Sequence, residues 1–226
     1  MKTFQNIITD KDIIQVVGVF IVSFGILIIP LLFLRENPPL LSFVMGLGLF
    51  TIVYLILRIF LSKKKMTMSD FGLTQVGFGI LLKYFFLGLL VLVVGGALSG
   101  FFSNLLGLEN QTAQTLNMTL SDTRWFNIIH LKIVVALLIP FAEEVLFRGF
   151  LFRYIRQQKS FLFSALLSSA LFSLVHFSLA ILPFTFLLGF ATAYAYEKSG
   201  NLWASILVHI AVNVTSVNLF LLTIYS

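Results

Sequence analysis

The stretch VGFGILLKYFFLGLLVLVVGGALSGFFSNLL, residues 76–106, contains a single charged side chain, Lys83. About 20 consecutive apolar residues are enough to cross a membrane as a helix, and this stretch is longer. Lys83 lies near one end, from which its long side chain can reach the headgroup region. The stretch therefore predicts a membrane-spanning helix, and the solvent that decides the fold is lipid.

The rest of the chain has the same character. Of its 226 residues, 59% are hydrophobic and 11% are charged, whereas soluble proteins have about 45–50% apolar and about 25% charged residues. The mean hydropathy is +1.03. A water-soluble fold of this size has no means of hiding so much apolar surface. We therefore expect an all-α, polytopic transmembrane helical bundle.

Six further apolar segments predict spans, which gives about seven in total. They are residues 13–34, 40–61, 126–152, 161–177, 180–196 and 202–224. The first of these is longer than the apolar core of a signal peptide, so we expect it to be a span rather than a cleaved signal. We divide the chain into an N-terminal transmembrane region of three spans, 1–120, and a core of four spans, 121–226.

The basic residues test this number of spans. With seven spans, one side of the membrane receives Lys2, Lys11, Lys63, Lys64, Lys65, Arg153, Arg156, Lys159 and Lys198. The other side receives the polar loop 104–125, whose one basic residue is Arg124. The positive-inside rule then predicts a cytoplasmic N-terminus and an outside C-terminus, in the plasma membrane if the source is bacterial.

The net charge of +6 is thus expected from cytoplasmic loops rather than from nucleic-acid binding, and membrane lipid is the expected partner. The sequence indicates no oligomeric state. Small residues four positions apart, Gly96 with Gly100 and Gly189 with Ala193, predict close approach between helices.

Ionisable residues inside a span are functional candidates, and one group lies in the sequence PFAEEVLFRG, residues 140–149. Glu144 and Arg148 are four apart and can form an ion pair on one helix face. Glu143 points about 100° away. A carboxylate beside arginine is held ionised and is a weak base, whereas a desolvated carboxylate without that partner suits a general base. We assign Glu143 as the base and Glu144 with Arg148 as its support; the alternative is a purely structural Glu–Arg clasp.

Two further motifs carry histidine. His176 ends the sequence FSLVH, residues 172–176, where a lone histidine is usually a capping or interfacial residue. His209 and Asn213 are four apart, and they can bond a neighbouring helix or donate to a developing oxyanion. At 1.5 Å per residue, a straight helix would leave His176 roughly 10 Å from the depth of Glu143. Helix tilt, a later start of the span or a kink at Pro140 would have to close that gap.

Several reaction classes are excluded by residue type. The chain has no cysteine, which excludes disulfides, thiolate metal sites and a cysteine nucleophile. No Ser-His-Asp set is apparent. An aspartate pair inside the spans is excluded because the aspartates fall in predicted loops, at Asp10, Asp12, Asp70 and Asp122. Hydrolysis by activated water remains.

The motifs together resemble those of the CAAX prenyl protease and bacteriocin-processing family, often called the Abi family. The matching residues are Glu143-Glu144-xxx-Arg148, Phe172-xxx-His176 and His209-xxx-Asn213, with Gly200-Asn201-Leu202-Trp203 before the last. The resemblance covers about residues 125–220. It implies an α-helical membrane endopeptidase whose eukaryotic members remove the last three residues of prenylated proteins. Bacterial members are associated with bacteriocin self-immunity and peptide-pheromone maturation.

The resemblance also implies residue roles. Glu143 would activate water with help from His176, and His209 and Asn213 would stabilise the oxyanion. Zinc is a possible cofactor, and its ligands would be Glu143, His176 and His209. However, Glu143-Glu144 is not the His-Glu-x-x-His arrangement of zinc proteases, and the similar eukaryotic enzymes are described as metal-free, so no cofactor is favoured.

The expected substrate is a membrane-associated protein or peptide, and not a prenylated protein if the source is bacterial. Two other functions stay open as alternatives. One is a non-catalytic membrane scaffold for bacteriocin immunity or regulation. The other is a proton-coupled transporter, against which the lack of an internal repeat counts.

Overall fold

The computed structural model describes residues 8–27, 29–34, 37–108 and 125–225. These residues form helices and turns and contain no strand, which confirms the all-α prediction. Most of the predicted polar loop 104–125, including Arg124, and the predicted boundary between residues 120 and 121 lie outside the described residues.

The observed helices follow the predicted spans closely. They are α1 (Asp10–Leu27), α2 (Ile29–Leu34), α3 (Pro38–Lys64), α4 (Phe78–Leu106), α9 (Phe161–Leu174), α10 (Leu182–Ser199) and α11 (Leu202–Tyr225). The predicted span 126–152 is one continuous helical run of α6 (Trp125–His130), η1 (Leu131–Leu138), α7 (Ile139–Glu144), η2 (Val145–Phe152) and α8 (Arg153–Arg156). Segments of α3, α4 and α11 are each long and apolar enough to cross a membrane. The protein is an integral membrane bundle for which about seven spans fit.

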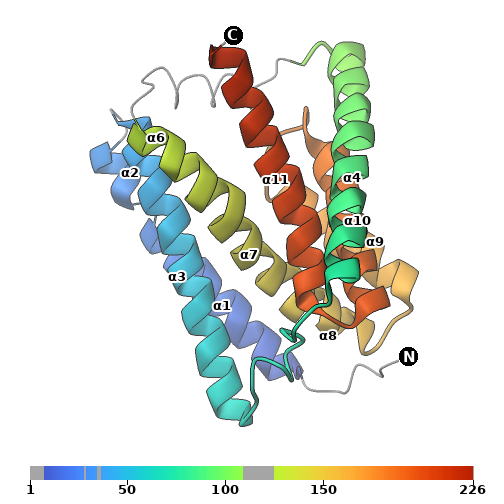
Figure 1. Cartoon of the computed structure of the whole chain (residues 1–226). Helices are drawn as coiled ribbons and strands as arrows, with labels where there is room; N and C mark the ends of the chain where they lie inside the picture. The colour runs from blue at the N-terminus through green and yellow to red at the C-terminus, as the bar shows by residue number, and fades with distance from the viewer. Residues whose placement is uncertain (1–7, 28, 35–36, 109–124, 226) are drawn as a thin grey trace.

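The run from α6 to α8 lies in the middle of the bundle. Figure 1 shows α1 and α3 on one side of it and α4, α9, α10 and α11 on the other. One apolar core joins both sides through this run, because Leu57 of α3, Phe150 of η2 and Ile206 of α11 are fully buried in the same cluster. The outward faces of α1 and α4 are apolar and exposed, for example at Ile14 and Val93, as expected of a surface that contacts lipid.

The ends that carry the basic residues lie together. Lys64 at the end of α3 pairs with Asp12 at the start of α1, with 2.6 Å between Nζ and Oδ2. Arg156 of α8 pairs with Glu197 near the end of α10, with 2.9 Å between Nη2 and Oε1. These contacts agree with the grouping of basic residues on one side, and the assignment of that side to the cytoplasm stays a prediction.

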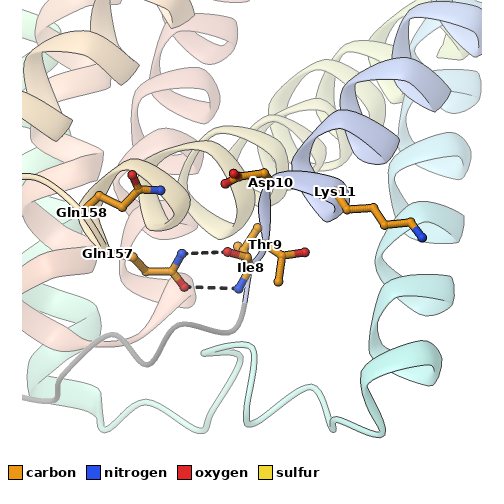
Figure 2. A pocket seen from close by; sticks show the side chains of 6 residues that line it. All are labelled: Ile8, Thr9, Asp10, Lys11, Gln157 and Gln158. Atoms are coloured by element: carbon orange, nitrogen blue, oxygen red, sulfur yellow. Dashed lines mark hydrogen bonds between the residues drawn. The ribbon is translucent and has the colours of Figure 1, made fainter.

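A side-chain amide attaches the start of α1 to the end of the central run (Figure 2). Gln157 donates through Nε2 to the carbonyl of Ile8 at 3.0 Å and accepts from the N–H of Ile8 at 3.2 Å. The hydroxyl of Tyr154 donates to Asp10 at 2.8 Å. A pocket opens here, lined by Ile8, Thr9, Asp10, Lys11, Gln157 and Gln158. No candidate site residue lines this pocket, so we assign it a structural role.

The loop between α3 and α4 is fixed to the start of α11. The side-chain nitrogen of Asn201 donates to the carbonyl of Thr74 at 2.9 Å, and its oxygen caps α11 by accepting from the N–H of Trp203 at 2.9 Å. The N–H of Leu202 donates to the carbonyl of Gly72 at 2.7 Å. Asn201 and Leu202, which belong to the Gly200–Trp203 part of the resemblance, therefore hold the loop between α3 and α4 against the start of α11.

Close helix contacts in α4 use other glycines than those predicted. A Cβ added at Gly88 would lie 2.7 Å from the carbonyl oxygen of Val208, and one at Gly95 would lie 2.7 Å from the ring of Phe184. Among the described residues nothing lies within 4 Å of such a Cβ at Gly96 or Gly100. The prediction for Gly96 and Gly100 is wrong, because these residues face outward.

The second predicted small-residue pair does pack. A Cβ added at Gly189 would lie 3.0 Å from the Cα of Ser169, and Ala193 is fully buried. Helices α9 and α10 therefore approach closely at this point, as predicted.

Replacing Gly88 by alanine should lower the thermal unfolding temperature in detergent, because the new methyl group meets the backbone of α11. Gly96→Ala is the matched control on the same helix. Its methyl group meets open space, and alanine has a helix propensity about 1 kcal/mol better than glycine, so its unfolding temperature should hold or rise. Equal destabilisation in both variants would contradict this account of the α4–α11 contact.

Candidate active site

Glu143 and Glu144 lie on α7, a six-residue α-helix between two π-helical segments. In η1 the N–H of Ile139 donates to the carbonyl of Val134, five residues back. The next residue, Pro140, has no N–H. With the same five-residue spacing, the N–H of residue 140 would donate to the carbonyl of Val135. Since Pro140 has no N–H, that carbonyl lacks a backbone partner.

Asn213 supplies the missing partner. Its side-chain nitrogen donates to the carbonyl of Val135 at 3.0 Å. A carbonyl without a partner inside a membrane protein is costly, so this contact stabilises the π-helical approach to the glutamates. The sequence predicted that Asn213 would either bond a neighbouring helix or face an oxyanion, and the first contact is present.

Glu144 is the centre of a buried polar cluster. Its Oε1 accepts from Nη1 of Arg148 at 3.1 Å, and the side chains of both residues have no exposure. The predicted Glu144–Arg148 ion pair is confirmed. The same Oε1 lies 2.8 Å from Nδ1 of His209 on α11, a contact that was not predicted. Arg148 also donates through Nη2 to the carbonyl of Gly189 on α10 at 2.9 Å.

Glu143 differs from Glu144 in accessibility. Its side chain is 19% exposed, whereas the side chain of Glu144 is fully buried. Its Oε2 lies 3.6 Å from Nε2 of His209, which is too long for a direct hydrogen bond. His209 therefore has one ring nitrogen held by the sealed carboxylate and the other facing the accessible one.

His176 lies in the turn after α9, because that helix ends at Leu174. Its Nδ1 lies 2.7 Å from the carbonyl oxygen of Phe172, which leaves Nε2 available. The imidazole is within electrostatic range of the Glu143 carboxylate. The gap in depth expected for a straight helix does not separate His176 from the other motifs.

Phe172 connects the three motifs, a role that we did not predict for it. Its ring is fully buried, and both imidazoles pack edge-on against it, with 4.9 Å between centroids for His176 and 5.7 Å for His209. The guanidinium carbon of Arg148 lies 4.6 Å from the same centroid, which is a cation–π contact. The four-residue spacing of Phe172 and His176 was the signal in the sequence.

The predicted zinc ligands do not form a metal-binding group. Within the described residues, no three or more His, Asp or Glu side chains are arranged to hold a metal ion. Glu143 and His209 approach each other, but His176 does not complete a ligand set with them. We therefore route no step of the chemistry through a metal.

The role of Asn213 can be tested through Pro140. Asn213→Ala should destabilise the protein by about 1–2 kcal/mol in detergent unfolding, because the carbonyl of Val135 loses its partner. Asn218→Ala is the control, since Asn218 is exposed and bonds the Val214 carbonyl of its own helix. In a Pro140→Ala background the new backbone N–H can serve the carbonyl of Val135. The cost of Asn213→Ala should then shrink, and an unchanged cost would refute the pairing.

Comparisons with known proteins show which proteins this chain is similar to. Residues 125–215 match the Rce1-like family, which is described as "Type II CAAX prenyl endopeptidase Rce1-like". The chain is 27% identical over 165 residues to "Putative membrane peptidase YdiL" of Bacillus subtilis strain 168. The aligned residues make up 72% of this chain and 64% of that protein. The chain is 38% identical over 84 residues to UPF0177 protein YxdF of Lactococcus lactis subsp. lactis strain IL1403, with 36% and 45% covered. No solved structure matches.

The chain spans less than two thirds of the length of either of these relatives. The matched segment 125–215 nevertheless includes every candidate site residue, from Glu143 to Asn213. The similarity is to a family of CAAX prenyl endopeptidases and to a relative that is itself named a putative membrane peptidase. The resemblance seen in the motifs is thus confirmed, and over residues 125–215 this membrane protein resembles the Rce1-like family of type II CAAX prenyl endopeptidases.

Proposed function

We propose that the protein is an intramembrane endopeptidase that hydrolyses a peptide bond of a membrane-associated protein or peptide. Water activated by Glu143 is the nucleophile. One observation carries the proposal: an accessible carboxylate, Glu143, lies beside an imidazole, His209, whose other nitrogen is held by the sealed Glu144–Arg148 pair.

The charges of this cluster balance when His209 is protonated. Glu143 and Glu144 carry two negative charges and Arg148 carries one positive charge, so an imidazolium at His209 makes the group neutral. Neutral, hydrogen-bonded clusters are the form in which charged side chains are tolerated in a membrane interior. In this state Nδ1 of His209 donates to Glu144, and Nε2 carries a proton toward the accessible side.

The reaction then follows from these positions. Glu143 takes a proton from water, and the water oxygen forms a bond to the substrate carbonyl carbon. His176 orients that water through its available Nε2. The oxyanion that forms accepts from Nε2–H of His209 and from the second N–H of the Asn213 amide, whose first N–H donates to Val135. When the carbon–nitrogen bond breaks, Glu143 returns the proton to the leaving amine.

The surroundings of the site define the proposed setting. The substrate reaches the site from the membrane, where lipid is the neighbour of the bundle. The N-terminus lies in the cytoplasm and the C-terminus outside, and the location is the plasma membrane if the source is bacterial. No cofactor takes part in the proposed reaction.

Glu143→Gln should lower the rate of peptide cleavage by roughly a hundredfold or more, because glutamine cannot accept the proton from water. The assay uses purified protein in detergent with a panel of fluorogenic, lipid-anchored peptides. Glu197→Gln is the control, since Glu197 pairs with Arg156 far from the motifs and should keep full activity. Cleavage by Glu143→Gln at the wild-type rate would overturn the assignment of the base.

Chelator treatment should leave the wild-type rate unchanged. A loss of activity that added zinc restores would overturn the metal-free proposal.

Glu144→Gln should act on folding as well as on activity. It leaves the buried guanidinium of Arg148 without its counter-charge, and breaking a buried ion pair from one side costs about 3–5 kcal/mol. The unfolding temperature should fall well below that of Glu143→Gln. Adding Arg148→Gln to Glu144→Gln should recover part of the stability but none of the activity, whereas equal stability of the two single glutamate variants would contradict the division of roles.

A further inference from the structure

His176 closes the last turn of α9 with both its backbone and its side chain. The N–H of His176 donates to the carbonyl of Ser173, three residues back, at 3.2 Å. In a continuing α-helix the same N–H would donate to the carbonyl of Phe172, four residues back. That carbonyl is instead the partner of the His176 ring, 2.7 Å from Nδ1. The imidazole thus replaces the missing backbone donor at the end of the helix.

The contact with Phe172 fixes the tautomer of the neutral imidazole. A backbone carbonyl can only accept a hydrogen bond, so Nδ1 of His176 is the donor and carries the proton. Nε2 then presents a lone pair. The ring lies within electrostatic range of the Glu143 carboxylate. A water that gives one proton to Glu143 can therefore donate its other O–H to Nε2 of His176, provided that the end of α9 keeps its position.

One hydroxyl group attaches the end of α9 to the start of α10. Ser173 donates through Oγ to the carbonyl of Leu182, the first residue of α10, at 2.8 Å. The same Oγ lies 2.7 Å from the hydroxyl oxygen of Thr185, one turn further along α10. With the Ser173 proton on Leu182, the hydroxyl of Thr185 is the donor of this pair. Both serine and threonine are buried, where a hydroxyl without a partner is costly, so the pair is a strong cross-link between the two helices.

Helix α4 in turn fixes the start of α10. The residue before α10 is Ile181, whose side chain has no oxygen with which to cap the first N–H groups of the helix. Ser99 of α4 supplies this oxygen and accepts from the N–H of Phe184 at 3.1 Å. Ser173 is therefore bonded to a helix that is itself held in place. A continuous series of contacts runs from α4 through α10 to the end of α9, where His176 lies.

We propose that Ser173 and Thr185 are positioning residues, whose hydroxyl pair holds the end of α9 so that the lone pair on Nε2 of His176 faces the catalytic water. The inference rests on the proposed function. Without the pair, α9 loses its cross-link to α10 within one turn of His176. The ring can then leave the Phe172 carbonyl, and its proton can exchange between the two nitrogens. The water is oriented for only part of the time, which slows the chemical step and leaves substrate binding unchanged.

Ser173→Ala should lower kcat for peptide cleavage by roughly tenfold and leave KM unchanged. Ser168→Ala is the matched control, because Ser168 is a buried serine of the same helix whose hydroxyl bonds the Ala165 carbonyl of α9 itself. It should keep the full kcat. Thr185→Val removes the hydroxyl at nearly constant shape and should also lower kcat, whereas Thr185→Ser should keep most of the wild-type rate. In a Ser173→Ala background Thr185→Val should add little, because the pair is already broken.

The ring nitrogens of His176 give a readout that a general loss of structure does not imitate. The chain has three histidines, so isotope-labelled histidine gives three sets of imidazole signals by NMR in detergent. The set of His176 is the one lost in His176→Gln. At a pH where the ring is neutral, the wild type should show one protonated and one unprotonated nitrogen. In Ser173→Ala the two signals should move toward each other, and in Ser168→Ala they should stay as in the wild type.

Wild-type nitrogen signals in Ser173→Ala would overturn the proposal, whatever the kcat of that variant. A higher KM at unchanged kcat would also overturn it, since Ser173 would then act on substrate binding. The same signal change in Ser168→Ala would contradict it as well, because any loosening of α9 would then suffice. If the signals of Ser173→Ala merge but the wild type cleaves no peptide, the proposed function fails and the positioning of the His176 ring stands.

Discussion

The rest of the site depends on one carboxylate oxygen, Oε1 of Glu144. It is shared by the guanidinium of Arg148 and the imidazole of His209 in a bundle interior without exposure. An unpaired charge in such a place is strongly destabilising, so α7, η2 and α11 must keep their register for the protein to fold. Glu143 makes neither of these two contacts, but it is the neighbour of Glu144 on α7. The contacts of Glu144 therefore also fix the position of Glu143.

Local contacts within one helix could be predicted from the sequence, whereas the specific partners of most contacts between helices could not; the close approach of α9 and α10 at Gly189 is an exception. The spacing of Glu144 and Arg148 fixes a shared helix face, and their ion pair is present as predicted. The bond from His209 to Glu144 joins residues 65 positions apart, and nothing in the spacing of either motif specifies it. The partner of Asn213, the Val135 carbonyl, depends on a π-helical register that no residue pattern showed.

Hydrophobicity located the helices well but not where they end. The predicted span 161–177 includes His176, whereas α9 ends at Leu174 and the chain turns there. The apolar residues continue past this end, so hydropathy gives no signal for it. The same limit applies to the glycines of α4. The four-residue spacing favoured Gly96 and Gly100. The close contacts are instead made by Gly88, which meets Val208 of α11, and by Gly95, which meets Phe184 of α10.

The shortness of α9 has a consequence for the membrane itself. Helix α4 has 29 residues and α9 has 14, so the two differ in length by about 22 Å at the rise of an α-helix. A bilayer adapts to a short apolar element by thinning around it, at a fraction of a kcal/mol per Å. Thinning shortens the distance that water must travel to the turn carrying His176. Acyl-chain length is therefore a physical variable that acts on the hydration of the site without contacting any residue in it.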